Sequence, residues 1–159
     1  MKTSIRKGLG FGLTSGIITT IGLIVGLNSG THSKTIILGG ILVIAVADAF
    51  SDALGIHISE ESGRKTIKTK EIWESTISTF IFKLIFALSF IIPILLFQLK
   101  TAVIISIIWG LFLLAIFSFY IAKQKNLNPT KAIAEHLIIA VLVIFITNFI
   151  GNFINKIFM

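Results

Sequence analysis

The sequence predicts an all-α integral membrane protein with five transmembrane helices. Mean hydropathy is +0.99, and of the 159 residues 55% are hydrophobic and only 13% are charged. Apolar runs approach or exceed the roughly 20 residues that a helix needs to cross a bilayer. These runs lack a two-residue alternation, and a backbone in lipid must satisfy its own hydrogen bonds, so helices are favoured over barrel strands. We expect a single transmembrane domain over residues 1–159.

The five expected spans follow the apolar runs at about residues 8–27, 35–59, 75–99, 101–122 and 137–157. The first span has glycines at positions 8, 12, 16, 22 and 26, a small-residue face on which another helix can approach closely. This face is either a packing surface within the chain or the seam of a homodimer.

The later spans also have distinguishing residues. The second span contains two aspartates, and the third contains Lys83 and, toward its end, Pro93, which is expected to kink the helix. The fifth has Asn148, Asn152 and Asn155 at helical spacing, for which interhelical hydrogen bonds are the expected use and a wet cavity the alternative.

Basic residues predict the orientation of the spans. Lys and Arg gather at the amino terminus and in the loops after spans two and four, and only Lys34, Lys100 and Lys156 lie on the opposite side. By the positive-inside rule the amino terminus is expected to be cytoplasmic and the carboxyl terminus outside. The first span is long and lacks an A-x-A-like cleavage site, so we expect a span and not a cleaved signal peptide.

The composition excludes several classes of function. The net charge of +7 lies in loops between apolar runs, where the lipid bilayer is the expected partner and nucleic acid is not. With no cysteine, any metal site must use oxygen and nitrogen. No P-loop, HExxH motif or nucleophile paired with a base is present, so we expect no enzyme and no permanently bound cofactor.

Two carboxylates inside the second span are the main indication of function. Asp48 and Asp52 are four residues apart and share a helical face. Charges at membrane depth usually face a bundle interior or an ion path. A helical rise of about 1.5 Å per residue places them at a depth similar to Ser15 and Lys83, which predicts one polar layer. The alternative is a closed ion pair of Lys83 with one aspartate that fixes helix register; the other carboxylate then needs a cation or a shared proton.

Further polar side chains lie at the expected cytoplasmic ends of spans two and three. His57 and Glu61 share one helical face, and Glu71 and Glu74 share another. Together with Glu60, these groups are candidates to attract a divalent cation to the pore mouth. Solvated helix ends are the alternative, and the basic loop SGRKTIKTK between them partly cancels their field.

Two segments carry a resemblance to a known family. SGIITTIGLIVGL resembles the first-span motif DGxxTTxxxVAG of the vacuolar iron transporter (VIT) family, and ADAFSDALGIHISEES resembles its second-span motif ADxxSMGxGxYLSxxS. The resemblance continues weakly through all five spans. It implies a dimeric five-helix carrier that exports ferrous iron or related divalent metals from the cytosol, in exchange for protons.

This chain departs from the family at the positions that matter most. The family's first-span aspartate falls on Ser15 and its second-span methionine on Asp52, whereas Asp48 matches the family's aspartate directly. A pocket of oxygen atoms favours harder cations such as Mn²⁺, Mg²⁺ or Ca²⁺, with Fe²⁺ still acceptable. The family's glutamate-rich insert between spans two and three is reduced to about a dozen residues, so the sequence describes a short member without the cytoplasmic metal-binding region.

Together, the residues and the resemblance predict a divalent metal transporter of the Fe²⁺/Mn²⁺ type that exports its substrate with proton coupling. The expected metal ligands are Asp48, Asp52, Glu60, Glu61, Glu71 and Glu74, and the secondary or pore-lining groups are Ser15, Thr19, His57 and Lys83. We expect a homodimer through span one and a location in the plasma membrane. The alternatives are a non-transporting scaffold or partner subunit with structural buried charges, and a carrier of an organic cation.

Overall fold

The computed structural model describes residues 2–63 and 68–158, and its regular structure there is entirely helical. The elements are α1 (Thr3–Thr31), α2 (Lys34–Glu61), α3 (Thr69–Ser89), α4 (Ile91–Leu96), α5 (Leu99–Gln124) and α6 (Pro129–Phe158). Counting α3 and α4 as one segment, five helical segments of this described part are long and apolar enough to cross a membrane. The predicted fold class is confirmed. The orientation stays a prediction, and Arg64 and Lys65, which support it, lie outside the described residues.

Most helices extend beyond the apolar runs, because polar residues continue the backbone hydrogen bonding at their ends. The third span is the exception: α4 ends at Leu96, short of the predicted residue 99, and Leu99 already begins α5. The largest difference is in α6, which begins at Pro129 instead of near residue 137. Pro129 occupies the first helical position, where its missing N–H costs nothing. Asn128 precedes it, and its Oδ1 accepts a hydrogen bond from the backbone N–H of Thr130 at 3.0 Å. This is a helix N-cap, which hydropathy alone does not locate.

The third span is interrupted at Phe90, between α3 and α4. Pro93 lacks an N–H, and its ring would clash with the carbonyl of Ser89, four residues earlier, in a continuous helix. The N–H of Phe90 bonds instead to the carbonyl of Ala87 at 3.2 Å, one residue closer than in an α-helix. The helix is therefore interrupted near the end of this span, where Pro93 was expected to kink it.

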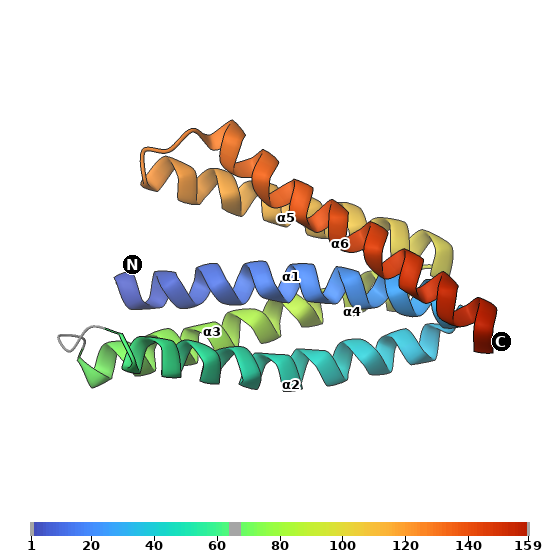
Figure 1. Ribbon diagram of the computed structural model, residues 1–159, viewed down its shortest axis with the longest axis horizontal. Helices are drawn as coiled ribbons and strands as arrows, with labels where there is room; N and C mark the ends of the chain where they lie inside the picture. The colour runs from blue at the N-terminus through green and yellow to red at the C-terminus, as the bar shows by residue number, and fades with distance from the viewer. Residues whose placement is uncertain (1, 64–67, 159) are drawn as a thin grey trace. The chain divides into compact units, whose positions relative to one another are not determined.

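The chain divides into two compact units, each made of parts of several helices. The first unit contains residues 1–20 and 41–90, and the second contains residues 21–40 and 91–159. In the first unit, α2 and α3 run beside the first half of α1 (Figure 1). The prediction of a single transmembrane domain stays a prediction.

Within the first unit, the glycine face of α1 packs on α3. A Cβ added at Gly8 or Gly12 would lie 2.5 Å from the backbone oxygen of Ser75 or Thr79, respectively. A Cβ at Gly16 would lie 3.1 Å from the backbone oxygen of Lys83. Glycine is required here because the backbones of α1 and α3 approach closely, as small-residue faces allow in membrane helices.

Within the second unit, the other end of the same glycine face packs on α6. A Cβ at Gly22 would lie 2.9 Å from Val143, and one at Gly151 would lie 2.3 Å from the backbone oxygen of Gly26. The asparagines of α6 add interhelical hydrogen bonds: Ser29 Oγ donates to Asn148 Oδ1 at 2.5 Å, and Asn155 Nδ2 donates to the carbonyl of Gly30 at 3.0 Å. Interhelical bonding is thus confirmed for these two asparagines. The glycine face is occupied within the chain, so a homodimer through span one would need other faces of α1.

Candidate functional site

The polar layer predicted inside the first unit is present and centres on Lys83. The Lys83 ammonium nitrogen donates to Ser15 Oγ at 2.9 Å and to Asp52 Oδ2. It also lies 2.5 Å from Asp48 Oδ2. Three helices therefore contribute to one point: α1 gives Ser15, α2 gives both aspartates and α3 gives the lysine.

The charge of this layer is not balanced. Two carboxylates and one ammonium leave one excess negative charge among the groups in contact. The Lys83 side chain is only 1% exposed, whereas Asp48 and Asp52 are 27% and 17% exposed. Asp48 Oδ2 is buried, and despite its short distance to the ammonium it has no hydrogen-bond partner among the described residues. A second cation or a proton would stabilise such an oxygen.

Small residues place the aspartates against the lysine. Ala45, Ala49 and Ala53 form a stripe at four-residue spacing on α2, and all three are buried. This stripe lies next to the aspartates on the same side of the helix. On α3, Ser75, Thr79 and Lys83 form a matching buried stripe against the glycines of α1. The close helix packing therefore fixes where the ammonium meets the carboxylates.

Thr19, predicted as a secondary ligand, is bonded within its own helix. Its Oγ1 donates to the carbonyl of Ser15 at 2.8 Å. Its hydroxyl hydrogen is therefore used, while the oxygen can still accept a bond or contribute to a cation. Ser15 is the hydroxyl of α1 that contacts the layer directly.

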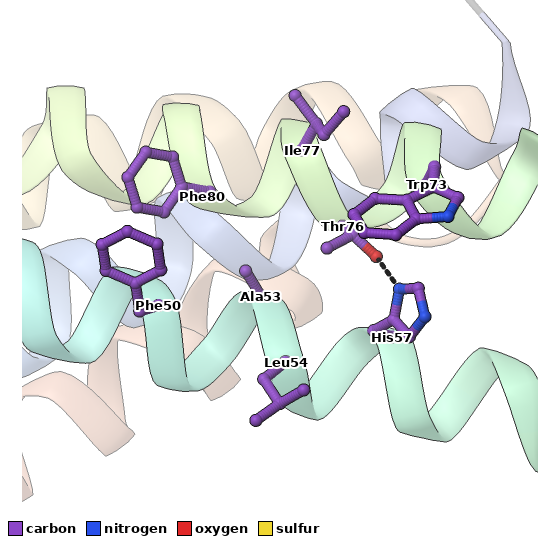
Figure 2. A pocket seen from close by; sticks show the side chains of 8 residues that line it. All are labelled: Phe50, Ala53, Leu54, His57, Trp73, Thr76, Ile77 and Phe80. Atoms are coloured by element: carbon purple, nitrogen blue, oxygen red, sulfur yellow. Dashed lines mark hydrogen bonds between the residues drawn. The ribbon is translucent and has the colours of Figure 1, made fainter.

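His57 lies in an apolar hollow between α2 and α3, of about 420 Å³ (Figure 2). Its Nδ1 is 3.0 Å from Thr76 Oγ1, and its ring makes a T-shaped contact with the ring of Trp73, with centroids 4.8 Å apart. Thr76 Oγ1 already donates to the carbonyl of Ile72, so we infer that Nδ1 carries the hydrogen and donates to Thr76. The rest of the lining is apolar, chiefly Phe50, Ala53, Leu54, Ile77 and Phe80.

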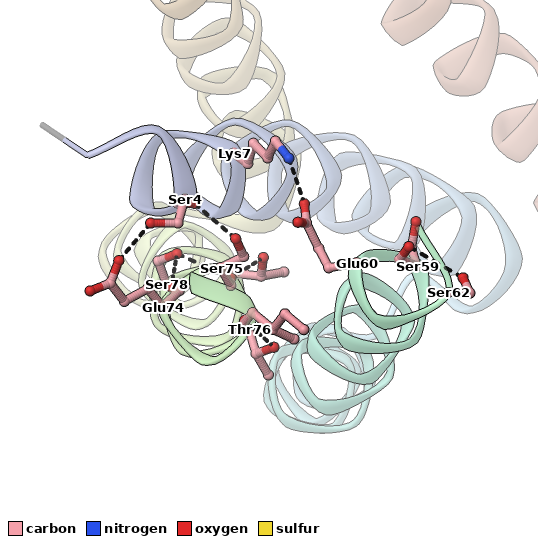
Figure 3. A network of polar contacts seen from close by, with 11 residues as sticks. Ser4, Lys7, Ser59, Glu60, Ser62, Glu74, Ser75, Thr76 and Ser78 are labelled. Atoms are coloured by element: carbon pink, nitrogen blue, oxygen red, sulfur yellow. Dashed lines mark hydrogen bonds and ion pairs between the residues drawn. The ribbon is translucent and has the colours of Figure 1, made fainter. Parts of the chain in front are cut away.

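Two of the four predicted glutamates form ion pairs with lysines of α1 or the residue before it. Glu60 Oε1 is 2.8 Å from Lys7 Nζ, and Glu74 Oε1 is 2.6 Å from Lys2 Nζ. Ser4 Oγ donates to the other oxygen of Glu74 at 2.6 Å. Figure 3 shows the contacts of Lys7 with Glu60 and of Ser4 with Glu74. The sequence interpretation did not pair these glutamates with Lys2 and Lys7. The lysines and the glutamates are expected at the same end of their helices, and this shared position could have predicted the ion pairs.

The same glutamates line a hollow of about 640 Å³ whose charge is mixed. Glu60, Glu71 and Glu74 contribute to it, together with four lysines: Lys2, Lys7, Lys68 and Lys70. Glu61 is exposed and is not part of this lining. The lysines oppose an attraction of cations to this hollow, and the role of the four glutamates as metal ligands stays a prediction.

The six predicted carboxylate ligands are not brought together as one site. Over residues 2–63 and 68–158, no group of three or more His, Asp or Glu side chains is placed to hold a metal ion. The structure assembles a smaller set, in which Ser15, Asp48 and Asp52 all contact the Lys83 ammonium. Two carboxylates and a hydroxyl are oxygen donors of the kind that also bind divalent cations.

The two span motifs that frame this layer are the part of the chain that matches a known family. Residues 9–74 match the model of the VIT family. The match covers most of α1, all of α2 and the start of α3, so it includes Ser15, Asp48 and Asp52 but not Lys83. It supports the VIT resemblance of the sequence and is consistent with a VIT family member. No curated protein matches the chain.

The VIT family match indicates transport of metal ions across a membrane, and the five apolar helical segments indicate a multi-pass membrane protein. A transporter family also agrees with the expectation that the chain is not an enzyme.

Proposed function

We propose that this protein is a carrier of divalent metal cations of the Fe²⁺/Mn²⁺ type, with Asp48 and Asp52 as its central ligands. The observation that carries the proposal is the contact of both carboxylates with a single cationic group deep in apolar helices. Ser15 would add a neutral oxygen, and Thr19 a second one. The proposed carrier works as a homodimer in the plasma membrane and exports its substrate from the cytosol.

The chemistry of the donors supports hard or intermediate divalent cations. Carboxylate and hydroxyl oxygens suit Mn²⁺, Mg²⁺ and Ca²⁺, and they accept Fe²⁺. The described residues offer no thioether or thiolate to this layer, since Cys is absent and both methionines are at the chain ends. We therefore place Mn²⁺ and Fe²⁺ as the substrates and expect little preference for soft metals.

Coupling to protons follows from the same carboxylates. Metal ligands must be deprotonated, so metal and protons compete for Asp48 and Asp52. One divalent cation balances the two carboxylates, as do two protons. A site that alternates between these occupants on the two sides of the membrane would exchange metal for protons.

A non-transporting scaffold is the second candidate, and the buried ammonium of Lys83 favours it. Lys83 on α3 contacts both aspartates of α2 and Ser15 of α1, so it can hold these three helices in register. A shift of one helix would leave a buried charge without its partner, which is costly. In that case the layer would be structural, and metal would have no site there.

Metal-dependent melting of the purified protein separates the two candidates. A carrier is stabilised by the cation that it binds, by about 2.7 kcal/mol when the free metal is at 100 times its dissociation constant. We expect Mn²⁺ and anaerobic Fe²⁺ to raise the melting temperature beyond the effect of NaCl at equal ionic strength. A melting temperature that no divalent cation raises would support the scaffold and reject the carrier.

A further inference from the structure

Lys83 presents its ammonium to the same oxygens that we propose for the metal. Its Nζ contacts Ser15 Oγ at 2.9 Å, Asp48 Oδ2 at 2.5 Å and Asp52 Oδ2. The ammonium donates hydrogen bonds to Ser15 of α1 and Asp52 of α2, and it forms an ion pair with Asp48 of α2. The three oxygens therefore surround a positive charge as metal ligands would, and this charge is the ammonium of Lys83.

Packing holds this cation in place. Lys83 belongs to the buried stripe of α3, and its Cγ would lie 3.5 Å from a Cβ at Gly16. The side chain is 1% exposed, so its stem is enclosed while its head reaches the carboxylates. A tethered group of this kind competes at an effective concentration in the millimolar range or above, whatever the composition of the solution.

We propose that Lys83 is a built-in competitor for the metal site: its ammonium occupies the Asp48–Asp52 site in the metal-free protein and leaves when a divalent cation binds. This inference rests on the proposed carrier function. The ammonium reduces the negative charge of the layer from two to one, so it keeps the site closed and compact without substrate. Lys83 thereby sets the lowest metal concentration at which the carrier loads.

Equilibrium binding of Mn²⁺ to the purified full-length protein and to two Lys83 variants tests the inference. Lys83→Met removes the competing charge and keeps a long apolar stem, so we expect it to bind Mn²⁺ about 10-fold more tightly or better. Lys83→Arg keeps a competing positive charge, so we expect it to bind Mn²⁺ more weakly than Lys83→Met does. An affinity of Lys83→Met equal to or weaker than the original would overturn the inference.

A second measurement on the unaltered protein covers the case in which Lys83→Met does not fold. Labelling with an amine-reactive reagent, followed by peptide mass spectrometry, reports the accessibility of the Lys83 amine. We expect Mn²⁺ to increase its labelling severalfold, with Lys131, which is highly exposed, as the unaffected internal reference. Labelling of Lys83 that saturating Mn²⁺ leaves unchanged would contradict displacement.

The two proposals fail in distinguishable ways. If the original protein binds Mn²⁺ but Lys83→Met binds it no better, the carrier stands and the competitor role is wrong. If neither protein binds Mn²⁺, the carrier function itself is wrong, and the competitor role is wrong with it.

Discussion

Replacing Asp52 by asparagine is expected to reduce Mn²⁺ uptake into proteoliposomes at least about 100-fold while the protein still folds. Changes to outer-shell partners of a metal already cost about 10- to 100-fold in affinity or activity, so loss of a direct ligand should cost no less. Asparagine keeps the size of the side chain, and Lys83 keeps Asp48 as a charged partner at 2.5 Å. The buried lysine is therefore not left unpaired, and the helices should stay assembled.

The measurement is the initial rate of metal uptake, normalised to reconstituted protein. Glu135→Gln is the matched control: it removes one carboxylate from an exposed position on α6, where the nearest ion-pair partner is Lys131 at 3.9 Å. We expect its uptake to equal that of the original protein. Unchanged uptake by Asp52→Asn would reject Asp52 as a ligand.

Replacing Gly12 by alanine is expected to destabilise the protein by about 1–3 kcal/mol, the usual cost of overpacking. The new Cβ would lie 2.5 Å from the backbone oxygen of Thr79 and 3.0 Å from the backbone nitrogen of Lys83. Backbone atoms cannot move aside as a flexible side chain can, so α3 must shift as a whole. Since α3 positions Lys83, the shift should also disturb the polar layer.

Gly55→Ala provides the control, because a Cβ there meets nothing within 4 Å. Alanine has the higher helix propensity by about 1 kcal/mol, so this variant should be equally stable or more stable. The comparison is made by thermal melting in the same detergent. Equal melting temperatures for both variants would show that the approach of α1 to α3 does not need the glycine.

The order of the spans and the polar layer were predictable from the sequence, each for a simple reason. Span positions follow from hydropathy, because a bilayer selects long apolar helices. The contact of Ser15 and Asp52 with Lys83 follows from helical rise, since residues at equal depth on packed helices can meet.

Other features depend on lateral packing, which a single sequence does not encode simply. The glycine face of α1 gave no sign that Gly8, Gly12 and Gly16 meet α3 while Gly22 meets α6. The sequence also does not show that one ammonium contacts both aspartates. That contact depends on which side of α3 carries Lys83 relative to α2.

Charge partners at the helix ends were also missed. Glu60 and Glu74 were considered with each other as a cation-attracting group, yet Lys7 and Lys2 pair with them. Long lysine side chains reach carboxylates that are distant in sequence, and a count of acidic residues in neighbouring spans does not account for them. The start of α6 was placed too late for a related reason: the Asn128 cap lies outside the apolar run.

Direct binding of Mn²⁺, measured by electron paramagnetic resonance of the free ion, tests the central claim that Asp48 and Asp52 hold the metal. The decisive comparison is with the variant Asp48→Asn/Asp52→Asn/Lys83→Met, which removes both carboxylates and their lysine together and so leaves no buried charge unpaired. We predict that the original protein reduces the signal of free Mn²⁺ and that this variant leaves it unchanged. A variant that removes Mn²⁺ from solution as well as the original protein would contradict the account.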